Sequence, residues 1–138
     1  MAVISMQTIR YINLLDKVTG VKTRKCFVHN NTVFFAVDRG QVSRAIGPGA
    51  VNIQKIQNGT GKRVKIVEEA NGIENAQRFI GSIVAPVRFK SLEIKNGEII
   101  ITAGSNQNKA SLIGRNRRRF EELKKIVQDY FNLDLKIV

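Results

Sequence analysis

The sequence is poor in the residues that build most catalytic and metal sites, with one cysteine, one histidine and no tryptophan in 138 residues. The single cysteine, Cys26, excludes an intramolecular disulfide and a thiolate metal cluster, and suits a reducing compartment. The single histidine, His29, stands beside an expected turn and is predicted to lie at the surface. The acidic residues are spread out, with no paired carboxylates beside a nucleophile. We therefore expect no catalytic site, no cofactor and no metal ion.

Long apolar runs are also missing from the sequence. The longest ones are too short to cross a bilayer, and residues 1–11 lack the continuous apolar core of a secretory signal. We expect a cytoplasmic protein with no membrane partner.

Acidic residues are scarce relative to basic ones: 23 Lys and Arg face 11 Asp and Glu, which gives a formal charge of +12 and a pI near 10.4. Residues 1–70 hold 11 basic and 4 acidic residues, and residues 71–138 hold 12 and 7. Both parts are positive, so the excess is not a detachable basic tail. Such a field suits repeated contact with a phosphate backbone.

Two segments, residues 8–67 and 74–138, show the same order of signals. Each begins with apolar residues at helical spacing and continues with two apolar strands around an Asn-containing turn. Two further helices, joined by a turn that begins Ile-Gly, then lead to a β-rich stretch. These elements are expected at residues 9–18, 26–28, 33–37, 42–46, 51–57 and 64–67, and again at 76–83, 92–94, 99–101, 109–113, 118–130 and 133–138.

The element order αββααβ, twice, predicts an α+β fold of two small domains, residues 1–70 and 71–138. Gly47 and Gly114 lie 67 positions apart, and the hairpin turns are spaced about the same. The spacing slips by about three residues before the last strand, which predicts one extra helical turn in the second copy. The linker is short and not flexible by composition.

A tight glycine turn between two helices can hold a single nucleic-acid strand. Glycine lets a phosphodiester approach the main chain closely. The next helix presents its free N–H groups and the positive end of its dipole to a phosphate. An apolar groove between helix and sheet can then receive the bases.

Residues 46–53, Ile-Gly-Pro-Gly-Ala-Val-Asn-Ile, and residues 113–120, Ile-Gly-Arg-Asn-Arg-Arg-Arg-Phe, resemble the KH signature I-G-x-x-G-x-x-I. The element order resembles KH type II, in which a three-stranded sheet is backed by helices. Two such modules in tandem resemble the archaeal NusA-like transcription factors over nearly the whole chain. The resemblance implies binding of single-stranded RNA, a role in transcription termination or antitermination, and RNA polymerase as a partner.

Ala50 and Arg117 stand where the signature has its second glycine. The methyl group of Ala50 is small, and the neighbouring Gly49 supplies flexibility. The long side chain of Arg117 would either block the strand or fold aside and pair with a phosphate.

Four arginines gather at the start of an expected helix: Arg115, Arg117, Arg118 and Arg119. One interpretation is an ordinary solvated face. However, cations at a helix N-terminus oppose the helix dipole, so an unassisted fold gains nothing from them there. We therefore favour contact with nucleic acid.

Two further features have ordinary explanations. Residues 58–63, Asn-Gly-Thr-Gly-Lys-Arg, resemble the end of a P-loop, but Ile56 and Arg63 break its pattern, so no small-molecule substrate is expected. The seven phenylalanines are assigned to the cores rather than to base stacking.

The main hypothesis is an RNA-binding, NusA-like factor without catalytic activity. The alternative is a structural component of a ribonucleoprotein or polymerase assembly, in which degenerate KH units bind protein. The predicted RNA-binding residues are Arg44, Ile46, Gly47, Pro48, Gly49, Ala50, Lys55, Ile113, Gly114, Arg115, Asn116, Arg117 and Arg118.

Overall fold

The computed structural model describes residues 6–138. The chain divides into two compact units, the first ending at Glu69 and the second running from Ala70 to Val138. The first five residues of the predicted 1–70 domain lie outside the described residues. No helix among residues 6–138 has the length and apolar character needed to cross a membrane.

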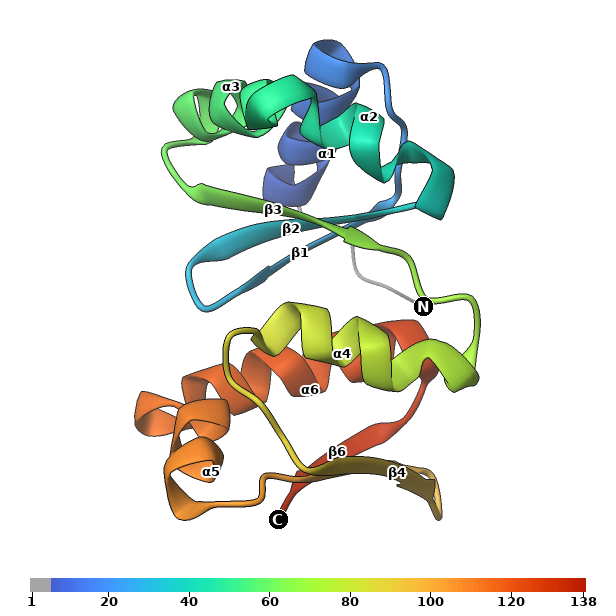
Figure 1. Ribbon diagram of the computed structural model, residues 1–138, viewed down its shortest axis with the longest axis vertical. Coiled ribbons are helices and arrows are strands. Elements are labelled where there is room, and N and C mark those ends of the chain that lie inside the picture. Colours follow the sequence, from blue (N-terminus) through green and yellow to red (C-terminus); the bar gives the residue numbers. More distant parts are fainter. Residues whose placement is uncertain (1–5) are drawn as a thin grey trace. The chain divides into compact units, whose positions relative to one another are not determined.

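The first unit has the expected order αββααβ, and its helices lie on one face of a three-stranded sheet (Figure 1). Its elements are α1 (Met6–Thr19), β1 (Lys25–His29), β2 (Thr32–Val37), α2 (Val42–Ile46), α3 (Val51–Thr60) and β3 (Arg63–Glu68). In the sheet order β1-β2-β3, β1 pairs antiparallel with β2, and β2 pairs parallel with β3. Asn30 and Asn31 both have positive φ, as a type I′ hairpin turn requires.

The core of the first unit lies between this sheet and its helices. Alternate residues of the central strand, Val33, Phe35 and Val37, pack with Leu15 of α1 and Ile56 of α3. The period of two in β2 and the apolar face of α1 therefore meet on the same side of the sheet. This packing fixes α2 and α3, the two helices that flank the first Ile-Gly pair.

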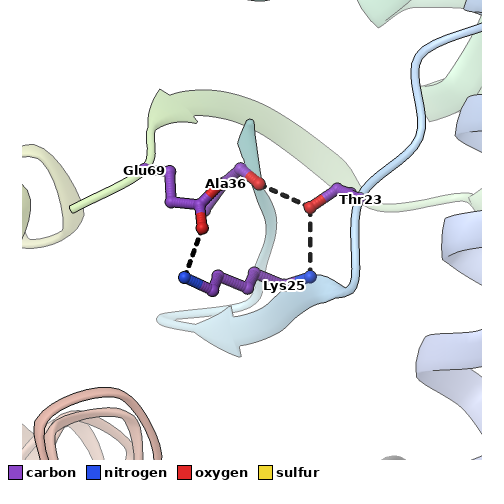
Figure 2. A network of polar contacts seen from close by, with 4 residues as sticks. All are labelled: Thr23, Lys25, Ala36 and Glu69. Carbon is purple, nitrogen blue, oxygen red and sulfur yellow. Dashed lines mark hydrogen bonds and ion pairs between the residues drawn. The ribbon is translucent and has the colours of Figure 1, made fainter. Parts of the chain in front are cut away.

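A polar network joins the three strands of the first sheet at one end (Figure 2). The Thr23 hydroxyl donates to the Ala36 carbonyl oxygen at 2.6 Å and accepts from the Lys25 backbone N–H at 3.1 Å. The Lys25 ammonium forms an ion pair with the Glu69 carboxylate. The Glu69 N–H donates to the Val37 carbonyl oxygen at 2.8 Å. Entry into β1 and exit from β3 are thus tied to the central strand.

The second unit repeats the order with α4 (Ala76–Val84), β4 (Ser91–Lys95), β5 (Glu98–Thr102), α5 (Asn106–Ile113), α6 (Arg118–Phe131) and β6 (Asp134–Ile137). Its sheet order, β4-β5-β6, has the same antiparallel and parallel pairs. Phe79, Ile99, Ile101 and Leu123 are among its buried core residues. The predicted α+β architecture of two αββααβ modules is confirmed.

The expected extra helical turn is present in the second copy. The helix after the glycine turn has 10 residues in the first unit and 14 in the second. Thr32 pairs with Arg63, whereas Glu98, at the same hairpin position, pairs with Asp134. The last strand is therefore displaced by the length of the added turn.

The surface position predicted for His29 is wrong. Its exposed fraction is 4%, and its ring lies edge-on to Phe34 with the ring centres 6.4 Å apart. The last residue of a strand is not necessarily solvated, because a neighbouring aromatic ring on the same face of the sheet can shield it from water.

Candidate nucleic-acid interface

The two Ile-Gly turns have the same backbone path. Gly47 has φ 78° and ψ 165°, and Gly114 has φ 77° and ψ 172°. Two residues later, Gly49 (φ 61°, ψ 26°) corresponds to Asn116 (φ 56°, ψ 28°). The first Ile-Gly turn (residues 46–50) and the second Ile-Gly turn (residues 113–117) therefore match residue by residue, although only their first two residues are identical.

Gly47 and Gly114 are required by the turns themselves. Positive φ with extended ψ is essentially restricted to glycine. A Cβ on Gly47 would lie 2.8 Å from Asn52 Nδ2, and one on Gly114 would lie 2.8 Å from Arg119 Cγ. Local packing thus already explains both glycines, without the close approach of a phosphate.

The fifth residue after each glycine caps the preceding helix. Asn52 Nδ2 donates to the Arg44 carbonyl oxygen at 3.0 Å, and Arg119 Nη1 donates to the Ser111 carbonyl oxygen at 3.1 Å. Both carbonyls lie three residues before the glycine, in the last turn of a helix, where the intrahelical donors run out. Arg119 is partly buried, so the arginine cluster expected at this helix contributes one structural cap and three exposed side chains.

The position of the second signature glycine is left-handed in both turns. Ala50 has φ 59° and ψ 28°, and Arg117 has φ 59° and ψ 22°. This conformation costs a residue with a side chain about 1–2 kcal/mol. Each turn therefore keeps the shape that favours glycine while carrying another residue.

The Arg117 side chain folds over an aromatic ring. Its guanidinium carbon lies 4.7 Å from the centre of the Phe120 ring, within the range of a cation–π contact. Both residues line a groove of about 390 Å³ between α5, α6 and the β5–β6 edge. The other lining residues are Glu98, Lys109, Ile113, Leu135, Lys136 and Ile137. The groove has an apolar floor and a mainly basic rim.

Other predicted residues of the second turn are exposed. Arg115, Asn116 and Arg118 face solvent, and Ile113 is partly buried in the wall of the groove. Neither Arg115 nor Arg118 has a carboxylate partner within residues 6–138. Their charge stands at the start of α6, where the helix dipole is also positive.

The predicted residues of the first turn are less tightly grouped. Pro48, Gly49 and Ala50 are exposed, and Ile46 is partly buried. The Arg44 side chain lies beside Gly20 at the end of α1: a Cβ built on Gly20 would come within 2.9 Å of its Nη2. Lys55 is exposed on α3, about one helical turn beyond its start.

Sequence reasoning missed six of the eight residues that line the groove, among them Lys109, Phe120 and Lys136. Lys136 is exposed between the buried Leu135 and Ile137, an alternation that could have placed it on the outer side of β6. Lys109 lies on α5 four residues before Ile113, on the same helical face. Phe120, assigned to the core, is indeed 8% exposed but also lies beneath Arg117 in the groove.

Comparisons with known proteins identify relatives of this chain. The KH domain family matches residues 32–81, from the start of β2 into α4, which includes the first Ile-Gly turn. A protein of Halococcus morrhuae named "Probable transcription termination protein NusA" is 28% identical over 133 residues, covering 95% of this chain and 94% of the relative. A protein of the same name from Methanocaldococcus jannaschii is 28% identical over 92 residues, covering 67% and 49% respectively.

A solved structure extends the comparison to the whole fold. The crystal structure of APE1850 superposes with a TM-score of 0.68 at 25% identity, covering 98% of this chain and 100% of the other. The similarity spans both αββααβ modules and agrees with the KH type II-like order of the elements.

Proposed function

Because the chain is an RNA-binding KH-domain protein similar to archaeal NusA proteins, we propose that it binds single-stranded RNA at its two Ile-Gly turns. It acts in transcription termination or antitermination, with RNA polymerase as its protein partner and no catalytic activity of its own. The names of the relatives support the role in termination.

One observation carries the proposal: the two turns share a backbone path at a spacing of 67 residues, although their sequences differ. A KH turn clamps the backbone of about four nucleotides. Each turn also leads into a helix whose positive end favours a phosphate. Both halves of the chain are basic, which adds attraction that is independent of sequence.

The proposed contact residues occupy the turns and the adjoining helices. In the first unit they are Arg44, Ile46, Gly47, Pro48, Gly49, Ala50 and Lys55. In the second unit they are Ile113, Gly114, Arg115, Asn116, Arg117 and Arg118. Arg44 contributes to the positive field from beside Gly20 rather than from the turn itself.

The sharpest test places one negative charge at the tip of each turn, in the double variant Gly49→Asp with Asn116→Asp. Both positions are exposed and left-handed, a conformation that Asp tolerates, and a Cβ on Gly49 would meet no atom within 4 Å. Substitution of Gly47 or Gly114 would instead clash with the next helix. We expect the double variant to fold and to bind a single-stranded RNA of about 12 nucleotides at least tenfold more weakly.

The neutral comparison is Gly49→Asn, which makes the tip of the first turn resemble Asn116 of the second. Fluorescence anisotropy should show that the parent and this variant both bind the RNA much more tightly than the double Asp variant does. Equal RNA affinity of the parent and a folded double Asp variant would contradict the proposal.

Ala50 and Arg117, which replace signature glycines, favour the alternative of a structural component that binds protein. That alternative predicts weak RNA binding that falls steeply between about 50 and 200 mM salt. It also predicts polymerase binding that withstands the same salt. Measuring both affinities at both salt concentrations distinguishes the two functions.

A further inference from the structure

We infer that the second Ile-Gly turn holds an RNA phosphate through the Arg117 side chain, whereas the first turn offers its main chain. The inference rests on the proposed function and specifies how one of the two turns would perform it. The group bound is a phosphodiester of the RNA. The protein group that binds it is the edge of the Arg117 guanidinium, which stacks on Phe120.

The backbone at Arg117 shows that this position is shaped for glycine. With φ 59° and ψ 22°, it has the same left-handed conformation as Ala50. The contact with Phe120 stabilises the fold by only about 0.5–1 kcal/mol. The left-handed backbone costs about 1–2 kcal/mol, and a cation also opposes the start of a helix. Strain of this kind at an exposed turn points to a role for the side chain.

The side chain is held in a defined place. Its guanidinium lies 4.7 Å from the centre of the Phe120 ring, and that ring is itself only 8% exposed. A guanidinium supported on one face by an aromatic ring keeps the N–H groups along its edge available. Arg117 is exposed and has no carboxylate partner among residues 6–138. It is thus a positioned cation with unused donors.

The groove around Arg117 fits a nucleotide rather than an isolated anion. Lys109 and Lys136 add positive charge to its rim and with Arg117 outnumber the one lining carboxylate, Glu98. Ile113 and Leu135 line the groove with apolar surface. A base splayed from a single strand could lie on the apolar part while its phosphate meets the basic rim. The planar N–H fork of arginine matches two phosphate oxygens at once.

The first unit lacks this pair of an arginine and an aromatic ring. At the spacing of 67 residues, Ala50 corresponds to Arg117 and Ile53 corresponds to Phe120, so neither the cation nor the ring is present. Exposed Pro48, Gly49 and Ala50 leave the main chain of that turn open to a strand. The same backbone therefore presents two different phosphate-binding surfaces.

The experiment compares Arg117→Gly and Arg117→Lys with the parent protein. Arg117→Gly relieves the left-handed strain and removes a cation from a helix start, and these gains offset the lost contact with Phe120. Its melting temperature should therefore equal or exceed that of the parent. Its affinity for the RNA of about 12 nucleotides should nevertheless fall about 5- to 20-fold. The slope of log affinity against log salt should become shallower by about 0.7, as expected for one lost phosphate contact. Arg117→Lys should keep the slope and lose part of the affinity, because it keeps the charge without the fork.

The matched control is Arg88→Gln, which removes an exposed arginine from the same unit at a position outside this groove. It should change RNA affinity by less than about twofold. Unchanged or tighter binding by Arg117→Gly would overturn the inference, because Arg117 would then obstruct the strand. Absence of RNA binding by the parent would instead contradict the proposed function, and the inference with it.

Discussion

The two Ile-Gly turns differ in chemistry far more than in shape. The first presents Pro-Gly-Ala after its glycine and the second presents Arg-Asn-Arg, yet corresponding φ and ψ values agree within about ten degrees. Only the first turn lies within the segment that the KH domain family matches. In both turns, the backbone path is thus set by the opening glycine and by the capping residue five positions later. The three positions directly after the glycine differ between the two turns and change the binding surface.

The largest predicted effect comes from substituting the glycines that open the turns. Gly114→Ala should lower the free energy of unfolding by about 2–4 kcal/mol, because its Cβ would meet Arg119 close to the α6 backbone. Gly47→Ala should be milder, since the atoms it meets are the end of the Asn52 side chain and, at 3.1 Å, a methyl group of Val51. Thermal and urea unfolding of both variants measures the difference.

Gly49→Ala is the control for these two substitutions, because its Cβ would enter open space. It should lower the free energy of unfolding by only about 1 kcal/mol, for the left-handed backbone alone. Equal destabilisation by all three variants would show that the clash with the fifth residue is unimportant.

The next largest effect concerns the caps. Arg119→Ala and Asn52→Ala each remove a hydrogen bond to a helix-terminal carbonyl and should lower the free energy of unfolding by about 1 kcal/mol. Arg119→Ala should destabilise more than Asn52→Ala, since Arg119 is partly buried and its hydrocarbon chain also packs against Gly114. If Arg119→Ala weakened RNA binding without changing the melting temperature, Arg119 would be a surface cation rather than a cap.

The smallest predicted effect is a loss of stability of the first unit at high pH. Burial raises the pKa of the Cys26 thiol from 9.0 to about 12. Because the folded pKa is the higher one, this group should cost no stability below pH 9 and should lower it as the pH rises from 9 toward 12. The matching position of the second unit is Leu92, which does not titrate.

Two measurements check this prediction. The native thiol should react with iodoacetamide at pH 8 at least tenfold more slowly than the urea-unfolded chain. Cys26→Val should also lose less stability than the parent between pH 9 and 11. A native thiol as reactive as the unfolded one would contradict the raised pKa of Cys26.

Periodicity and turn residues predicted most of the fold. Apolar spacing placed α1 and α4, the Asn-containing turns placed both hairpins, and the Ile-Gly pairs aligned the two units. The extra turn of α6 followed from a slip in spacing, which is a property of the chain alone. These signals lie in short stretches of sequence, so they can be interpreted without knowing the tertiary contacts.

The details of the site depend on contacts that spacing does not encode. Asn52 and Arg119 perform the same capping role with different chemistry, so no shared residue type marks the position. Arg117 contacts Phe120 from a left-handed backbone, which arginine seldom adopts. The burial of His29 likewise depends on its surroundings in the folded sheet.

The most direct measurement is a titration of isotope-labelled protein with single-stranded RNA, followed through the backbone amide signals. The account predicts that the amides of Gly47 and Gly49 and those of Gly114 and Asn116 shift over the same range of RNA concentration. Shifts confined to other surfaces, with both sets of turn amides unmoved at saturation, would contradict it.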